Sequence, residues 1–369
     1  MKTDFHIYKV GILIGLFLTV IEAGGAERYE FFNGVRSLGM GGAQVAIVND
    51  ETALMGNPAG LGRLRDYFLT VADPEIALGE DTQGMVDADI TAFMDPQEVL
   101  DLVETRSAGT RFHQTAQLFP SFVVTNFGIG LFAKYGTDGF IDETSGLFNL
   151  HYREDVAVVM GFNFRMFDGK LKMGFSARGV NRTEINRTDI VATSTGNTIN
   201  NLAKEGFGIG GDAGIILTAP VKWLPALAAV YRDVGNTSYG VNKGMFHSAD
   251  DSTAPDTTPG TLDVGFSVQP ILGKKTRLTI TGEVKDVLVA VEDEDTEDDI
   301  SRRTHYGLEL NMADAFFIRG GVNQGYWTAG IELSMFNYQL QGAMYGEEVG
   351  TKDNKVEDRR YVAKFSWRF

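Results

Sequence analysis

The chain has 369 residues, a formal net charge of -16 and no cysteine. An acidic surface argues against a nucleic-acid partner, and the lack of cysteine excludes disulfides, thiol nucleophiles and thiolate metal sites. Beyond the first 26 residues no long apolar run occurs, which excludes a helical membrane protein.

Residues 1–26 have the order of a secretory signal peptide. Two lysines precede an apolar run from Val10 to Ile21, and small residues follow. We predict cleavage after Ala26, which leaves a mature chain that starts at Glu27. A retained signal anchor is the alternative, although the apolar run is shorter than the roughly 20 residues that a helical span needs.

The segment of residues 27–62 precedes the first predicted strand and is rich in glycine. Glycine permits compact and irregular backbone, and the pair Asn57-Pro58 marks a turn. Residues 63–369 then read as strands, the first of them at Asp66–Ala72. An amphipathic helix is predicted near Asp95–Glu104, where a proline suits the first turn.

Later segments of the chain alternate apolar and polar residues with period two. Thr276–Lys285 and Trp327–Met335 show this alternation, as do the last nine residues, YVAKFSWRF, where an aromatic and apolar face opposes a polar and charged face. Alternation alone also fits a soluble β-sandwich.

Three further features favour a transmembrane barrel. Aromatic residues lie near predicted strand ends, the chain stops at a phenylalanine that completes the alternation, and connections alternate between tight turns such as Phe167–Lys170 and long polar loops such as Glu347–Asp358. We therefore predict an all-β protein, an antiparallel transmembrane β-barrel of about 14 strands. It would be monomeric, in contact with lipids, in the outer membrane of a Gram-negative-type bacterium.

A barrel of this size has a lumen too wide for side chains alone to fill. We predict that residues 27–62 fold inside it as a hatch; a periplasmic tail is the alternative. Charges that face the lumen need partners or water, so we expect salt bridges between wall and hatch. The residues of this network are Lys172, Arg178, Arg277, Glu283, Lys285, His305, Glu309, Glu332, Lys364 and Arg368.

The stretch RSLGMGGAQVAIVNDETALMGNPAGL, Arg36–Leu61, resembles the N-terminal motif of the FadL family of outer-membrane long-chain fatty-acid transporters and their PorV/PorQ-type relatives. The resemblance implies that hydrophobic substrates bind in an outer groove, pass to an interior pocket and leave sideways through a gap in the wall. It also places the hatch motif on Asp50, Asn57, Pro58, Ala59 and Gly60. The final strand resembles the signal read by the outer-membrane barrel assembly machinery, which implicates Trp367 and Phe369.

The predicted function is passive uptake of hydrophobic small molecules such as long-chain fatty acids, with no enzymatic activity and no cofactor. One alternative is a PorV-like barrel that transports nothing and acts as a scaffold in protein secretion or surface attachment, through its acidic outer loops. A simple aqueous pore is another.

Other patterns in the sequence give little support for further chemistry. The five histidines, His6, His113, His151, His247 and His305, show no metal-ligand spacing, so no metal site is predicted. The glycine pattern of residues 206–214 lacks the strand, turn and helix context of a nucleotide site. The acidic run Glu292–Asp299 is expected to be a solvated outer loop, and calcium binding there is a weak hypothesis.

Overall fold

The structure is a computed structural model, and it describes residues 29–83, 109–141, 148–190, 202–242, 253–288, 300–350 and 354–369. The predicted signal peptide, the helix near Asp95–Glu104 and the acidic run Glu292–Asp299 lie outside these residues. Within the described ranges, no helix is long and apolar enough to cross a membrane.

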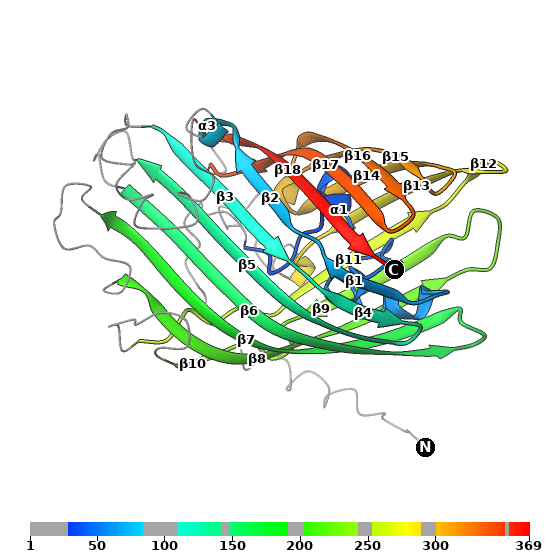
Figure 1. The fold of residues 1–369 in the computed structure, drawn as a ribbon, viewed down its shortest axis with the longest axis horizontal. Coiled ribbons are helices and arrows are strands. Elements are labelled where there is room, and N and C mark those ends of the chain that lie inside the picture. Colours follow the sequence, from blue (N-terminus) through cyan, green and yellow to red (C-terminus); the bar gives the residue numbers. More distant parts are fainter. Residues whose placement is uncertain are drawn as a thin grey trace, which may run out of the picture.

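One antiparallel sheet dominates the structure and closes on itself (Figure 1). Closure occurs where β18 pairs on one side with β17 and on the other with β1 and β2. The strands are β1 Phe68–Ala72, β2 Glu75–Gly79, β3 Arg111–Leu118, β4 Ser121–Val124, β5 Phe127–Ile141, β6 Phe148–Met166, β7 Leu171–Ile190, β8 Lys204–Thr218, β9 Ala226–Arg232, β10 Tyr239–Val241, β11 Thr261–Val268, β12 Ile271–Gly273, β13 Thr276–Val284, β14 Thr304–Met312, β15 Phe316–Asn323, β16 Tyr326–Met335, β17 Tyr338–Glu348 and β18 Glu357–Arg368.

Several of these strands are two segments of one longer wall strand. β1 and β2 both pair with β18, β3 and β4 both pair with β5, β9 and β10 both pair with β8, and β11 and β12 both pair with β13. The wall is therefore a closed antiparallel barrel of 14 strands, which confirms the predicted fold class.

Side chains on the wall alternate between an apolar outer face and a buried inner face. On β6, Val158, Phe162 and Phe164 are 51%, 48% and 61% exposed, whereas Val159 and Asn163 between them are buried. A soluble sandwich would cover such an apolar face with a second sheet, but here the sheet closes and the face stays bare. This is the pattern of an outer-membrane barrel of Gram-negative bacteria, whose outward side chains meet lipid.

The last strand follows the predicted alternation. Phe365, Trp367 and the terminal Phe369 are exposed on the outer face, and Lys364 and Ser366 are buried on the inner face. The rings of Trp367 and Phe369 lie 5.6 Å apart, centroid to centroid.

Short turns gather at the end of the barrel where β18 finishes. The hairpin at Phe167–Lys170 is one of them, and positive φ angles at Phe167, Asp168 and Gly169 make the turn tight. Short turns of bacterial barrels face the periplasm, so we name this end the inner end and the opposite end the outer end. At the outer end β17 runs to Glu348 and β18 starts at Glu357, so the loop predicted at 347–358 is shorter than expected.

Two neighbouring wall strands are each interrupted at a proline. β1 and β2 are separated at Asp73-Pro74, and β3 and β4 at Phe119-Pro120. Proline has no backbone N–H to donate to the ladder, which accounts for a break in a strand at these positions. We refer to the two adjacent interruptions as the wall break.

The N-terminal segment lies inside the barrel (Figure 1). Its short helices contact inward faces of the wall: α1 contacts β15 to β18, α2 contacts β6, and η1 contacts β6, β7 and β8. Nearly every described residue from Phe32 to Leu64 is at least partly buried. The helices are α1 Val35–Gly39, α2 Ala53–Gly56, the 3₁₀ helix η1 Pro58–Arg63, α3 Glu80–Gln83 and the 3₁₀ helix η3 Ile300–Arg303.

Candidate functional site

The candidate site is the contact between the N-terminal segment and the wall, and its centre is the Asn-Pro-Ala turn. Asn57 is fully buried, and its side-chain oxygen accepts a hydrogen bond from the Ala59 backbone N–H at 3.0 Å. Its side-chain Nδ2 donates to the Val45 carbonyl at 3.0 Å. Pro58 starts η1, where its missing N–H costs nothing. The side chain of Asn57 thus connects the turn to the earlier part of the N-terminal segment at Val45.

A hollow in the wall receives this turn. Gly174 on β7 and Gly214 on β8 are direct partners across the ladder. A Cβ at Gly174 would lie 2.1 Å from the Pro58 carbonyl carbon, and a Cβ at Gly214 would lie 2.0 Å from the Asn57 side-chain oxygen. Only glycine allows this close approach, so the wall and the turn fit each other at the backbone level.

Two wall side chains hold the segment on either side of the turn. Asn163 on β6 donates to the Ala59 carbonyl at 3.1 Å. Arg232 on β9 donates to the carbonyls of Met55 and Gly56 at 3.1 and 2.9 Å, and its Nε donates to Asp263 at 2.7 Å. These bonds satisfy the last carbonyls of α2, which have no partner within so short a helix.

Replacement of Asn57 by alanine is expected to destabilise the docked segment by about 2 kcal/mol. The substitution removes a cap of η1 and leaves the Val45 carbonyl without its donor in a buried place. Faster hydrogen exchange at the Ala59 amide would report the change. The exposed Asn236, whose side chain accepts a single bond from Gly260, is a control, because Asn236→Ala should leave that exchange rate unchanged.

A second contact lies on the opposite wall. The Gly41 N–H donates to the Thr328 hydroxyl at 3.0 Å, and the Gly41 carbonyl accepts from His305 Nδ1 at 2.8 Å. Gly307 and Gly321, which are direct partners in the ladder, leave room for Met40 and Gly41. Paired wall glycines therefore seat the segment at two separate places.

Arg36 connects the segment to the wall through charge. Its guanidinium makes two hydrogen bonds of 2.8 and 2.9 Å to Glu309 on β14, and it also lies 3.3 Å from Asp50 of its own segment. Glu309 accepts a further bond of 2.8 Å from Arg319, which also pairs with Glu332. Both wall carboxylates and Arg319 are buried, so this network links α1 to three wall strands.

Three further polar contacts join the segment to the wall. Glu283 accepts from the backbone N–H groups of Gln44 and Val45 at 2.7 and 2.8 Å, and Lys285 pairs with Glu30. Arg368 lies 3.6 Å from Glu51. The lumen is therefore crossed by polar contacts on several sides of the segment.

The two adjacent carboxylates of the segment differ in acidity. Burial would raise the pKa of Asp50, but the Arg36 guanidinium and the hydrogen bonds from Thr52 lower it below its ordinary value. Burial and the neighbouring charge of Asp50 raise the pKa of Glu51, against the opposing effect of Arg368. Of the pair, Asp50 is the residue that carries the charge opposite Arg36.

The remaining residues of the predicted network do not contact the segment through an ion pair. Arg178 pairs with Asp212 at 2.7 Å and with Asp233, and Lys364 pairs with Asp73 at 2.9 Å. Lys172 is buried beside Gly62 and donates to the Gly169 carbonyl. Arg277 is 50% exposed at the inner end and pairs with Asp314 of the next turn.

A group of four phenylalanines, Phe31, Phe32, Phe119 and Phe132, joins the segment to the wall break. Phe32 lies 5.9 Å from Phe119 and 6.0 Å from Phe132, and Phe31 lies 5.0 Å from Phe132, between ring centroids. The Phe119 backbone N–H donates to Asp73 at 2.5 Å, so the two interrupted strands bond each other at the break. We name this group the phenylalanine cluster. The sequence showed no periodic signal for it, because its members come from the hatch and two wall strands.

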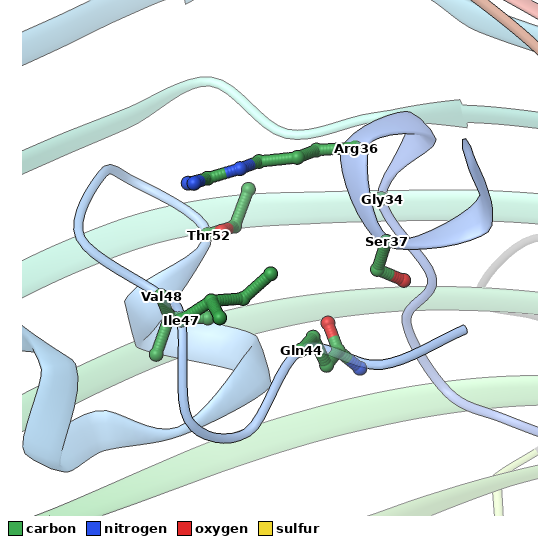
Figure 2. Close-up of a pocket in the computed structure, with 7 residues that line it drawn as sticks. All are labelled: Gly34, Arg36, Ser37, Gln44, Ile47, Val48 and Thr52. Atoms are coloured by element: carbon green, nitrogen blue, oxygen red, sulfur yellow. The ribbon is translucent and has the colours of Figure 1, made fainter. Parts of the chain in front are cut away.

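A narrow pocket lies within the segment itself (Figure 2). It opens between the turn of α1 and the loop that leads to α2, and both polar and apolar side chains line it. Its lining is formed by Gly34, Arg36, Ser37, Gln44, Ile47, Val48 and Thr52. All of these residues belong to the N-terminal segment, so the pocket lies within that segment and not between the segment and the wall.

No family model matches the sequence, and no curated protein does either. Solved structures do match in shape. The chain is similar to the monoaromatic hydrocarbon channel CymD (TM-score 0.54, 13% identity, 91% of this chain and 96% of that chain). It is also similar to the toluene transporters TbuX of Ralstonia pickettii (0.51, 16%, 91% and 98%) and TodX of P. putida (0.52, 13%, 91% and 98%).

The chain thus has the fold of the FadL-like outer-membrane transporters, and the resemblance drawn from Arg36–Leu61 is confirmed at the level of the fold. The three structures named above are a hydrocarbon channel and two toluene transporters. Among the described residues, no three His, Asp or Glu side chains gather at a metal-binding distance.

Proposed function

We propose that this protein allows hydrophobic small molecules to cross the outer membrane without energy input. The observation that supports this proposal most is the phenylalanine cluster, which places apolar rings of the hatch directly against the wall break. Leu54 and Leu61 of the hatch also pack against the wall, at Gly128 of β5 and Gly161 of β6, but these two strands are unbroken there. An apolar interior that reaches an interrupted part of the wall is what an apolar ligand would need.

The proposed path leads from the lumen past the phenylalanine cluster to the wall break and so into the membrane. Phe119 closes this path, since its side chain is 2% exposed and its backbone bonds to Asp73. A small movement of Phe32 and Phe119 would join the apolar interior to the lipid. Monoaromatic hydrocarbons and long-chain fatty acids are both candidates for the ligand. Monoaromatic hydrocarbons should be tested first, because CymD is a monoaromatic hydrocarbon channel and TodX is a toluene transporter.

Uptake by intact cells tests the proposal. A Gram-negative host without FadL-like transporters, expressing this protein, should take up labelled toluene or a labelled long-chain fatty acid in a saturable way, and should gain no uptake of a hydrophilic sugar. Equal uptake of both kinds of solute would indicate a simple pore, and no gain for either hydrophobic probe would contradict the proposal.

Substitution at Phe119 is expected to change uptake of the hydrophobic probe by several fold. Phe119→Ala removes a ring that fills the wall break and leaves a cavity there, at a cost of about 3 kcal/mol or more to local packing. We expect faster uptake of the hydrophobic probe with this variant. Phe164→Ala alters an exposed, lipid-facing ring of similar size and should leave uptake unchanged. Equal effects of the two substitutions would show that the wall break has no special role.

A further inference from the structure

Basic side chains at the inner end of the barrel differ from those deeper in the lumen. Deeper side chains have carboxylate partners; they include Arg36, Arg178, Arg182, Arg319, Lys285 and Lys364. At the inner end a group of basic side chains has no ion pair with any residue that the structure describes. These are Arg63, Arg65, Arg165, Lys170, Lys172, Lys222, Lys274 and Lys275.

Lys172 is the most buried member of this group. Its side chain lies on the inward face of β7 next to the end of the hatch, and the residue is 7% exposed. Its ammonium donates to the Gly169 carbonyl, which uses one of its three hydrogens. A buried cation without a counter-ion is costly, so a ligand that supplied negative charge here would be favoured.

Arg63 and Arg165 bring two more positive charges to the inner end of the lumen. Arg63 ends η1, and its Nη1 donates to the Ala46 carbonyl at 2.6 Å. Burial and the charge of Arg36 lower the pKa of Arg63 to about 10, the reverse of what a carboxylate partner would do. Arg165 on β6 lays its guanidinium beside Gly169. The charges of Arg63 and Arg165 both act on Lys172.

A buried acceptor adjoins these cations. The side-chain oxygen of Asn163 accepts no hydrogen bond within the described part of the chain, although the residue is 5% exposed. The point where Gly62 would carry a Cβ lies 2.3 Å from this oxygen and 3.1 Å from Lys172 Cδ, so both side chains pack directly against Gly62 at the end of the hatch. The end of the hatch is therefore held next to Lys172 by close packing.

We propose that Arg63, Arg165 and Lys172 form a binding site for a phosphate-type oxyanion at the inner end of the lumen. A phosphate or phosphate monoester has three or more acceptor oxygens on one centre and can accept charge-assisted hydrogen bonds from several cations at once. Because Arg63 belongs to the hatch and the other two to β6 and β7, the bound anion ties the end of the hatch to the wall. This site does not depend on the proposed transport of hydrophobic molecules.

Binding by the full-length protein in a phosphate-free, non-ionic detergent tests the site. Inorganic phosphate, titrated at constant ionic strength, should bind saturably. Lys172→Met and Arg63→Gln should each weaken binding by about tenfold or more, because each removes a charge-assisted hydrogen bond. A second experiment uses the protein in lipid nanodiscs with or without an anionic phospholipid. The rate of trypsin cleavage after Arg65 then reports whether the end of the hatch stays docked against the wall.

The two arms distinguish the source of the anion. Binding of free phosphate points to a soluble phosphate, whereas protection from trypsin only in anionic nanodiscs points to a lipid headgroup, and either result supports the site. Lys275→Gln is the matched control, because Lys275 is an exposed cation of another inner turn and has no ion pair with a residue that the structure describes. The proposal is overturned if neither phosphate binding nor protection from trypsin is observed. It is also overturned if the binding or protection persists in both Lys172→Met and Arg63→Gln, or if Lys275→Gln abolishes it to the same extent.

Discussion

Replacement of Gly174 by alanine is expected to push the Asn-Pro-Ala turn out of its seat while the barrel stays closed. The added Cβ would stand 2.1 Å from the Pro58 carbonyl carbon and 2.2 Å from the Ala59 nitrogen. Both are backbone atoms of the turn, and the Ala59 N–H is bonded to the buried Asn57 side chain, so the turn must shift as a unit. Overpacking of this kind costs about 3 kcal/mol, and here we expect at least that loss in the docking of the hatch.

Trypsin cleavage after Arg63 and Arg65 measures this effect, since both lie at the end of the hatch. A loss of about 3 kcal/mol raises the open population on the order of 100-fold, and the cleavage rate should follow it. Gly136→Ala serves as the control, because a Cβ there meets nothing closer than Thr115 Cγ2 at 3.5 Å. Cleavage at the same rate in both variants would mean that the glycine hollow does not hold the hatch.

Replacement of Arg36 by methionine is expected to cost about 3–5 kcal/mol in the docking of the hatch. Arg36 makes a two-bond contact with buried Glu309, and removal of one partner from a buried pair leaves the other charge uncompensated. Arg319 remains beside Glu309 and keeps the loss at the lower end of this range. Hydrogen exchange at the α1 amide of Leu38 should accelerate accordingly.

A double-mutant cycle separates the ion pair from other effects of the substitution. Arg36→Met combined with Glu309→Gln should cost clearly less than the sum of the two single substitutions, because the second change removes the stranded charge. Arg277→Met is the exposed counterpart. Its pair with Asp314 is 50% and 69% exposed, so we expect a loss below about 1 kcal/mol. Strict additivity in the cycle would show that Arg36 and Glu309 do not act as a pair.

Much of the fold could be predicted because a strand that separates lipid from a polar lumen must alternate its side chains. In β13, β16 and β18 the alternation correctly predicted which side chains face outward and which face the lumen. The tight turn predicted at Phe167–Lys170 is also present, at the inner end of the barrel. The interruptions at Asp73-Pro74 and Phe119-Pro120 were not predicted. A proline break within one wall strand and a turn between two strands have similar local signals.

The contacts of the site were harder to predict than the fold. Which lumen charge meets which partner depends on how strands far apart in sequence are registered around the barrel. Arg319 and Asp73 were not among the predicted residues, although each pairs with a residue that was. Gly174 and Gly214 form a hollow only because β7 and β8 place them opposite each other, a fact of register that alternation leaves open.

Conductance across a planar bilayer tests most directly the claim that the N-terminal segment fills the lumen of this barrel. The intact protein should show no steady ionic current, because the segment and its polar contacts block the aqueous path. A variant that lacks residues 29–62 should show stepwise open channels, as expected of an empty barrel of this size. Steady current through the intact protein, equal to that of the shortened variant, would contradict the account.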